Sequence, residues 1–202
     1  MKDFWNERYA AEHYFYGTEP NAFLAAQAHR LQPGQSALAV ADGEGRNGVW
    51  LAQQGLDVLS VDFSAPALEK SRRLAERCGV SSLRTELADL QEWDWKEHHF
   101  DVVVAIFVQI FGSVQRPAFH RNMVKALKPG GLLILQAYTP KQLEYKTGGP
   151  SNLDNLYGAE TLAADFADLD ILHLQEREHE ISEGVGHCGM SAVVELVARK
   201  RG

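Results

Sequence analysis

The stretch that most constrains this chain is a short apolar run that breaks into closely spaced glycines and then becomes apolar again. The apolar run is Ala37–Val40, the glycines lie in 41–48 (Ala-Asp-Gly-Glu-Gly-Arg-Asn-Gly), and Val49–Ala52 resumes the apolar pattern. This pattern predicts a strand, a tight turn and a helix. Glycines suit such a turn because a ligand can approach the backbone without meeting a Cβ atom. The alternative is an ordinary turn that uses glycine only for bending.

Strands and helices continue to alternate along the chain. We expect helices over 4–11, 22–31, 49–54, 64–77, 115–127 and 159–166, and further strands over 56–62, 82–87, 100–106, 132–137, 171–181 and 191–199. Residues 128–131 (Lys-Pro-Gly-Gly) predict a turn, and 138–158 a long connection. The run 100–106 is apolar nearly throughout, which is typical of a parallel strand buried on both faces.

This order predicts one α/β domain over residues 1–202. The expected fold is a doubly wound, Rossmann-like, seven-stranded and mostly parallel sheet with helices on both faces and a C-terminal antiparallel hairpin. Within it, residues 1–31 form a helical cap with an aromatic loop. Residues 138–158 form a lid or acceptor loop, whose bends Thr147–Pro150 would supply.

Composition and charge restrict the classes of partner that this protein can bind. The formal net charge of −7 and a pI near 5.6 argue against nucleic acid. The longest apolar runs are too short to span a membrane, and the N-terminus lacks a signal-peptide core, so we expect a cytoplasmic protein. Cys78 and Cys188 belong to no CxxC pair, which gives no indication of a metal site or disulfide. We expect a small-molecule partner, and a monomer or weak dimer.

The predicted ligand site lies at the carboxyl ends of the parallel strands. Asp62 ends the second strand, 17 residues after Gly45, where a carboxylate can accept hydrogen bonds from two ribose hydroxyls. The alternative is a cap on the next helix, although Ser64 is available for that role. Asp89 and Phe107 follow the next two strands and should reach the same edge.

The charges beside the glycines bear on which nucleotide is bound. Residues 43–48 match G-x-G-x-x-G, so a nicotinamide or flavin cofactor must be considered. However, Asp42 and Glu44 would oppose a pyrophosphate, an effect that Arg46 would partly offset. S-adenosylmethionine has a cationic sulfonium and no phosphate, and these carboxylates favour it.

Several motifs together resemble a known family. They are Trp5–Tyr9, Tyr16–Asn21, the glycine turn with Arg46-Asn47, Asp62, Ala88-Asp89-Leu90, Leu127–Gly131 and Glu183–His187. Their order is similar to that of class I S-adenosylmethionine-dependent methyltransferases, and more narrowly to the small bacterial group related to tellurite-resistance and thiopurine methyltransferases. The resemblance implies S-adenosylmethionine as cofactor. It implies cofactor contacts at Tyr16, Glu19, Ala41, Asp42, Gly43, Gly45, Arg46, Asn47, Asp62, Phe63, Ala88, Asp89, Leu90 and Phe107.

Two positions depart from the family's pattern. Ala41 replaces its first glycine, and Ala39 replaces an acidic residue that helps to organise the methionine end of the cofactor. Asp42, Glu19 or backbone carbonyls are the possible substitutes for that acidic residue.

Methyl transfer from a sulfonium requires mainly alignment and exclusion of water. Aromatic faces at Tyr14, Tyr16, Phe107 or Tyr138 would stabilise the cation. For an acceptor that carries a proton, His187 and His13 are candidate bases, with Tyr14 nearby; a structural role is the alternative for each.

The chain lacks an Asn- or Asp-Pro-Pro-Tyr sequence after the strand at 100–106, which favours a small-molecule acceptor over a nucleic-acid base. The leading hypothesis is thus a small-molecule methyltransferase. The alternatives are an NAD(P)-dependent oxidoreductase and a non-catalytic S-adenosylmethionine-binding domain.

Overall fold

The computed structural model describes residues 2–95 and 97–202, which divide into two compact units. Unit 1 comprises Met1–Trp93 and Glu183–Gly186, and unit 2 comprises Asp94–Ser182 and His187–Gly202. The short segment Glu183–Gly186 therefore groups with the N-terminal half of the chain, although its neighbours in sequence belong to unit 2.

Unit 1 alternates helices with parallel strands. Its elements are α1 (Lys2–Tyr9), α2 (Ala22–Ala26), η1 (Ala28–Arg30), β1 (Ser36–Val40), α3 (Arg46–Gln53), β2 (Asp57–Asp62), α4 (Ala65–Arg77) and β3 (Leu83–Leu87). β2 pairs in parallel with both β1 and β3. Burial of apolar residues on these elements, Leu38, Leu51 and Val58 among them, stabilises the unit.

Two helix ends in unit 1 show how local sequence sets the boundaries. Ser64 caps α4 by accepting a hydrogen bond from the Ala67 amide (3.5 Å), as predicted. The helix expected over 22–31 is instead divided. The Gln27 amide donates to the Leu24 carbonyl (2.9 Å), a tighter turn that ends α2 and leads into the 3-10 turn η1.

Unit 2 contains the remaining strands. Its elements are β4 (Phe100–Ile106), α5 (Arg116–Ala126), β5 (Leu127–Tyr138), α6 (Gln142–Tyr145), η2 (Leu153–Asn155), α7 (Ala159–Asp165), β6 (Leu169–Glu183) and β7 (His187–Lys200), with the last residue of β6 in unit 1. β4 and β5 are parallel, and β5 and β7 are antiparallel. The expected turn over 128–131 is wrong as an element boundary, because β5 already pairs with β4 at Leu127 and then bulges before Leu132.

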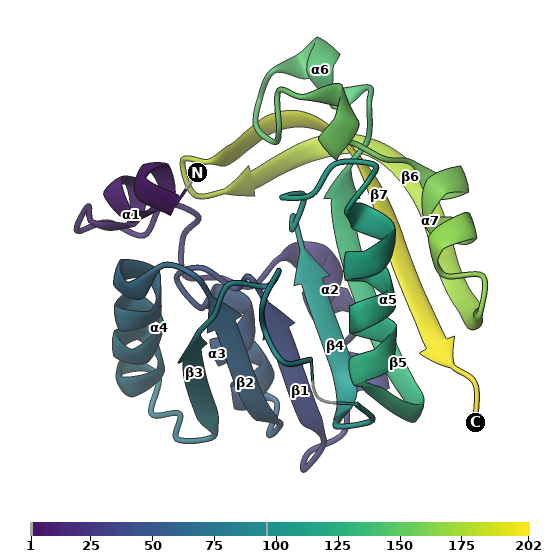
Figure 1. The fold of residues 1–202 in the computed structure, drawn as a ribbon. Coiled ribbons are helices and arrows are strands. Elements are labelled where there is room, and N and C mark those ends of the chain that lie inside the picture. The colour runs from purple at the N-terminus through teal and green to yellow at the C-terminus, as the bar shows by residue number, and fades with distance from the viewer. Residues whose placement is uncertain (1, 96) are drawn as a thin grey trace. The chain divides into compact units, whose positions relative to one another are not determined.

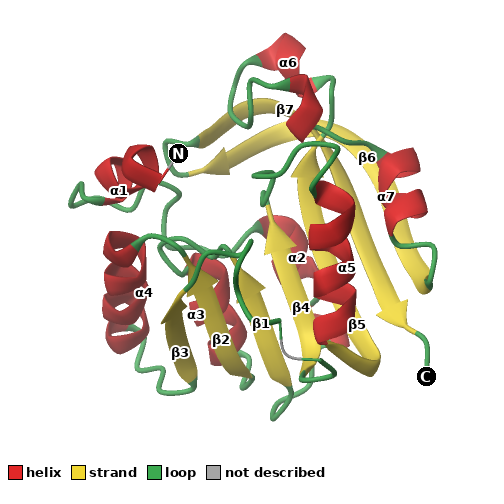
Figure 2. Ribbon diagram, viewed as in Figure 1, coloured by secondary structure: helices red, strands yellow, loops and turns green. Residues whose placement is uncertain are grey.

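The strand order is β3-β2-β1-β4-β5-β7-β6 in a seven-stranded sheet (Figures 1 and 2). This confirms the predicted mostly parallel, Rossmann-like sheet with a C-terminal antiparallel hairpin. No helix among the described residues is long and apolar enough to cross a membrane.

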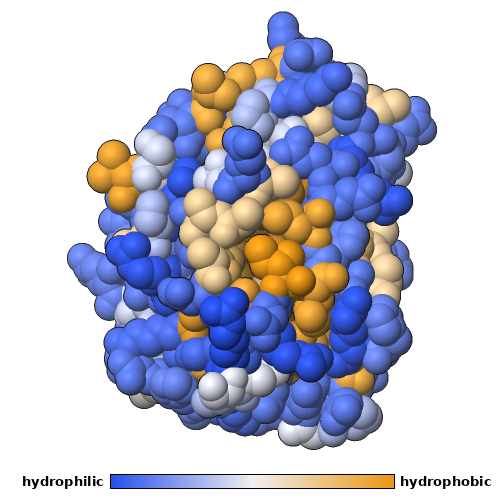
Figure 3. All heavy atoms as spheres, turned by 90° about the vertical axis from the view of Figure 1, so that its right-hand side faces the viewer, coloured by the Kyte–Doolittle hydropathy of each residue, from blue (hydrophilic) through white to orange (hydrophobic). Residues whose placement is uncertain are grey.

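The outermost strand, β6, is largely exposed. Residues 175–178 and Glu180 are exposed, and most of them are charged. Ile171 and Leu172 near its start are 39% and 41% exposed. Figure 3 views the molecule from the side of unit 2 that carries α7 and β6, and shows apolar side chains among the polar ones there.

Candidate functional site

The glycine turn after β1 is a close-packed structure and not merely a bend. Gly45 begins α3 with φ of 88°, and a Cβ at this position would lie 2.1 Å from Ser71 Oγ on α4. Gly43 has φ of 58°, and its Cβ would lie 3.0 Å from the Tyr9 hydroxyl. Glycine is thus required at Gly45 by close packing and at both positions by left-handed backbone. Tyr9, which lies over this turn, was not among the predicted site residues.

Ala41 has a left-handed backbone, the conformation that glycine adopts readily. Its φ is 46°, in the left-handed region where residues with a Cβ are disfavoured. The alanine is therefore accommodated with backbone strain at one residue.

Asp62, at the end of β2, supports the turn directly. Its Oδ2 accepts a hydrogen bond from the Gly43 amide (2.9 Å), and its Oδ1 accepts one from the Ser64 amide (2.8 Å). The residue is 4% exposed, and burial raises the pKa of its carboxyl group while these hydrogen bonds lower it. Each carboxylate oxygen has a second lone pair, so Asp62 can hold the turn and also accept from ligand hydroxyls.

Asp42 directs its carboxyl group into the protein. Its oxygens accept hydrogen bonds from the Gly48 amide (3.2 Å) and the Ser60 hydroxyl (2.9 Å). Although the residue as a whole is half-buried, burial of this group raises the pKa of Asp42 to about 7, against the opposing effect of both hydrogen bonds. A carboxyl group with this pKa is partly protonated near neutral pH.

Glu44 is buried and paired. Its Oε1 lies 2.7 Å from Lys70 Nζ, and its Oε2 accepts a hydrogen bond from the Phe15 amide (2.7 Å). The prediction that Asp42 and Glu44 present two full negative charges to a pyrophosphate is therefore wrong. Lys70 neutralises Glu44, and Asp42 is partly protonated. The glutamate instead fastens the aromatic N-terminal loop to the glycine turn.

The N-terminal candidates differ in their surroundings. The Lys70 ammonium donates to the His13 carbonyl (2.7 Å), and the His13 residue is exposed. The Tyr14 hydroxyl donates a hydrogen bond to the Lys70 carbonyl (3.0 Å), which attaches Tyr14 to α4. Tyr16 is half-buried with its ring centroid 6.4 Å from that of Trp5, and Glu19 is exposed. The structure thus gives Tyr14 a structural contact and brings Tyr16 toward the aromatic residues of α1.

Three motifs that are distant in sequence meet in one hydrogen-bond network. The Asn21 amide donates to Asn47 Oδ1 (2.9 Å), and Asn21 Nδ2 donates to Glu183 Oε1 (2.9 Å). Arg46 NH2 lies 2.6 Å from Glu183 Oε2. Arg46 NH1 is buried without a hydrogen-bond partner among the described residues. Such an orphaned donor marks a place where a ligand acceptor fits.

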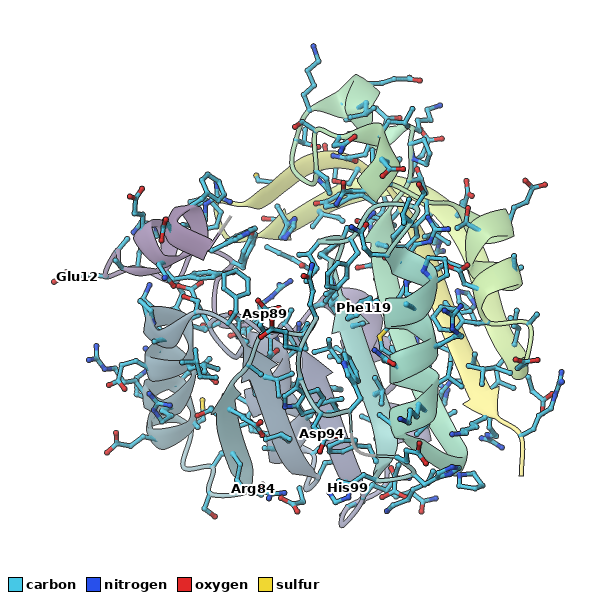
Figure 4. All side chains as sticks on the ribbon, viewed as in Figure 1. Glu12, Arg84, Asp89, Asp94, His99 and Phe119 are labelled. Atoms are coloured by element: carbon cyan, nitrogen blue, oxygen red, sulfur yellow. The ribbon has the colours of Figure 1, made fainter. Side chains whose placement is uncertain are left out.

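The segment after β3 supplies two buried residues and one exposed residue. Ala88 and Leu90 are 8% and 5% exposed, and the Ala88 amide donates to the Asp62 carbonyl (2.9 Å). Asp89 is exposed beyond the carboxyl end of β3, whereas Arg84 lies toward the other end of that strand (Figure 4). Phe63 is half-buried next to Asp62. These residues occupy the strand ends where the prediction placed them.

In unit 2, two predicted residues, Phe107 and His187, meet Tyr138. The ring of Phe107 stacks on those of Tyr138 and His187, with centroids 4.6 and 4.4 Å apart. The Tyr138 hydroxyl lies 2.5 Å from His187 Nδ1. Phe107 follows β4 with φ of 57°, a strained value for an aromatic residue. Strain of this kind is concentrated at functional positions.

The segment 138–158 is fastened at several points. Gln109 exchanges two hydrogen bonds with the Tyr138 backbone (2.6 and 2.9 Å), and Asn155 Nδ2 donates to the Gln109 carbonyl (2.9 Å). The buried Gln142 accepts from the Ala192 amide (2.9 Å). The backbone around Tyr138 is thereby fixed. Among the described residues, no three His, Cys, Asp or Glu side chains are grouped to hold a metal ion.

Comparison with known proteins gives a family match for part of the chain. Residues 37–131 match a family described as a methyltransferase domain. The chain is 31% identical over 110 residues to phosphoethanolamine N-methyltransferase 3 of Arabidopsis thaliana, a match that covers 54% of this chain and 22% of the relative. The chain thus spans less than a quarter of that relative's length.

Solved structures extend the likeness over nearly the whole chain. The N-methyltransferase NodS of Bradyrhizobium japonicum, bound to S-adenosylhomocysteine, superposes with a TM-score of 0.72 at 16% identity and covers 98% of this chain and 97% of NodS. Residues 37–131 thus match a methyltransferase domain, and NodS shows the same fold over nearly the whole chain. TehB of Haemophilus influenzae superposes with a TM-score of 0.73 at 19% identity, covering 99% of this chain and 67% of TehB, and so shares the fold.

Proposed function

We propose that this protein transfers a methyl group from S-adenosylmethionine directly to a small-molecule acceptor. The observation that carries the proposal is the contact between Asp62 and the Gly43 amide, which fixes a carboxylate and a glycine turn together at the ends of β1 and β2. This is the arrangement that an adenosyl ligand requires, with acceptors for ribose hydroxyls beside a backbone that a ligand can approach.

The residues of unit 1 fit this cofactor. Asp62 would accept hydrogen bonds from the ribose hydroxyls. Arg46, whose buried NH1 has no hydrogen-bond partner among the described residues, would bind the carboxylate of the methionine part. Because Glu44 is paired with Lys70, the protein does not place an uncompensated negative charge beside that carboxylate.

The bound cofactor supplies an electrophilic methyl group on a sulfonium. The protein then has to align the acceptor, exclude water and remove a proton when the acceptor carries one. His187 would take that proton, and Tyr138 would stabilise the resulting imidazolium by accepting a hydrogen bond from Nδ1. The remaining candidates of unit 1, Asp89, Tyr16 and Glu19, would lie around the cofactor.

Two of the similar proteins are named as N-methyltransferases, which supports an amine nitrogen as the methylated atom. The acidic balance of the chain agrees with an acceptor that is a small molecule and not a nucleic acid. We propose a small amine as the first class of acceptor to test.

Calorimetry with S-adenosylhomocysteine tests the cofactor assignment. We expect saturable binding to the wild-type protein, a loss of at least about tenfold in affinity for Asp62→Ala, and wild-type affinity for Asp57→Ala, which alters an exposed carboxylate of the same strand. Tight NADH binding without S-adenosylhomocysteine binding would instead establish the oxidoreductase alternative. Unchanged affinity of Asp62→Ala would remove the ribose assignment.

Turnover separates an enzyme from a non-catalytic binding domain. Labelled S-adenosylmethionine is incubated with a panel of small amines, and transfer of label to any of them supports the proposal. Tight cofactor binding with no transfer to any nucleophile in the panel would favour the binding domain.

A further inference from the structure

Glu183 is the meeting point of the network that joins the three motifs of unit 1. Its Oε2 lies 2.6 Å from Arg46 NH2, and its Oε1 accepts hydrogen bonds from Asn21 Nδ2 (2.9 Å) and the Ala22 amide (3.3 Å). The Arg46 and Glu183 side chains are 7% and 10% exposed. The proposed function gives Glu183 no role, although one carboxylate engages three donors here.

The first consequence concerns Arg46. A guanidinium is planar with donors in a fixed fork, so a carboxylate that holds NH2 also sets the direction of NH1. Glu183 therefore fixes the orientation of the buried donor that has no partner among the described residues. Its negative charge also neutralises Arg46 while the ligand is absent.

The second consequence concerns the turn between β6 and β7. The amides of Val185 and Gly186 donate to the Phe15 carbonyl (2.9 and 3.3 Å). A Cβ on Gly184 would lie 2.5 Å from that carbonyl oxygen, and one on Gly186 would lie 2.3 Å from the rings of Phe15 and Tyr16. The turn is thus seated on the N-terminal loop at close range, and Glu183 anchors its first residue. His187 follows Gly186 directly in the chain.

We propose that Glu183 is a positioning residue: it orients Arg46 toward the cofactor's carboxylate and anchors the turn that leads to His187. The inference rests on the proposed function. Under this proposal, Glu183 affects cofactor affinity through Arg46. Through the turn, it also affects the hydrogen exchange of the Val185 and Gly186 amides.

The test compares Glu183→Gln with Glu180→Gln, an exposed carboxylate of the same strand. Calorimetry measures the affinity for S-adenosylhomocysteine, and hydrogen exchange with mass spectrometry follows the peptide that contains 183–187. We expect Glu183→Gln to lose at least about tenfold in affinity and to exchange the turn amides faster, and Glu180→Gln to match the wild type. If Glu183→Gln does not fold, Glu183→Asp, which keeps the charge but shortens the reach, takes its place.

The same comparison in an Arg46→Lys background separates positioning from general destabilisation. If Glu183 acts through Arg46, its substitution has little further effect on affinity there. Equal losses in both backgrounds, or a folded Glu183→Gln protein with wild-type affinity, would overturn the inference and leave the proposed function intact. A wild-type protein that does not bind S-adenosylhomocysteine would overturn both.

Discussion

The carboxylate of Glu44 lies 2.7 Å from the ammonium of Lys70, and the two side chains are only 2% and 9% exposed. Glu44 also accepts a hydrogen bond from the Phe15 amide, and Lys70 donates to the His13 carbonyl. One buried ion pair thus connects the glycine turn, α4 and the N-terminal loop.

Breaking this pair should be costly. Glu44→Gln leaves the Lys70 ammonium buried without its counter-charge, which typically destabilises a protein by about 3–5 kcal/mol. Urea denaturation measures the loss. Glu69→Gln, which breaks an exposed pair on the same helix, is the control and should leave the midpoint unchanged. A Glu44→Gln protein as stable as this control would show that the pair does not hold the loop.

Ala41→Gly should be neutral or stabilising. Left-handed backbone costs a residue with a Cβ about 1–2 kcal/mol, and glycine adds back about 0.4–1 kcal/mol through the entropy of the unfolded chain. We expect a net change in the free energy of unfolding between about zero and a gain of about 1.6 kcal/mol. Ala39→Gly, in the buried interior of β1, should instead lose stability. Equal losses for the two variants would contradict the strain at Ala41.

Asp42 should make stability depend on pH. Its pKa rises from 3.8 to about 7 on folding, mainly through burial, so the folded protein holds this proton when the unfolded chain has lost it. The contribution is fully present below pH 4 and is lost as the pH rises to 7. Each pH unit changes it by at most about 1.4 kcal/mol.

The measurement is the free energy of unfolding of Asp42→Asn relative to wild type between pH 4 and 8. The amide imitates the protonated acid, so the free energy of unfolding of the variant relative to wild type should increase as the pH rises. Asp57→Asn, at an exposed position of β2, serves as the control. A difference between Asp42→Asn and wild type that does not vary with pH would mean that the carboxyl group titrates normally.

Tyr138→Phe tests the contact with His187. The substitution removes only the hydroxyl that lies 2.5 Å from Nδ1, in a side chain that is fully buried. If His187 is the base, kcat should fall by about 10–100-fold, because the imidazolium that forms loses the hydroxyl that accepts a hydrogen bond from it.

The measurement is kcat and KM of Tyr138→Phe against the wild type with the same acceptor. A lower kcat with little change in KM supports a role of the hydroxyl through His187. An unchanged kcat with a raised KM would show that Tyr138 acts on binding and not through His187.

Regular elements were predictable where one physical pattern dominates. Phe100–Ile106 is an uninterrupted apolar run, and it forms β4 over those residues. The turn predicted over 128–131 is wrong as an element boundary, although Lys-Pro-Gly-Gly is typical of turns. The pairing of Leu127 with Phe100, which makes them a bulge within β5, depends on a partner strand that local sequence does not specify.

The positions of the candidate residues at strand ends were predictable, but the directions of their side chains were not. Asp62 and Gly43 could be placed by their positions at strand ends. The burial of Glu44 against Lys70 could not, because a charged residue beside a glycine is equally compatible with facing the ligand. Glu183 stood out only as part of a motif, since its partner Arg46 lies 137 residues away in sequence.

The charges of β6 have a consequence for the protein's behaviour in concentrated solution. β6 ends the strand order, so one side of its backbone is an edge that another chain could extend. Glu176, Arg177, Glu178 and Glu180 are exposed along it. Charged side chains disfavour such pairing, because a second strand would bring charged groups close to one another and remove part of their hydration. This row therefore protects a long strand against aggregation.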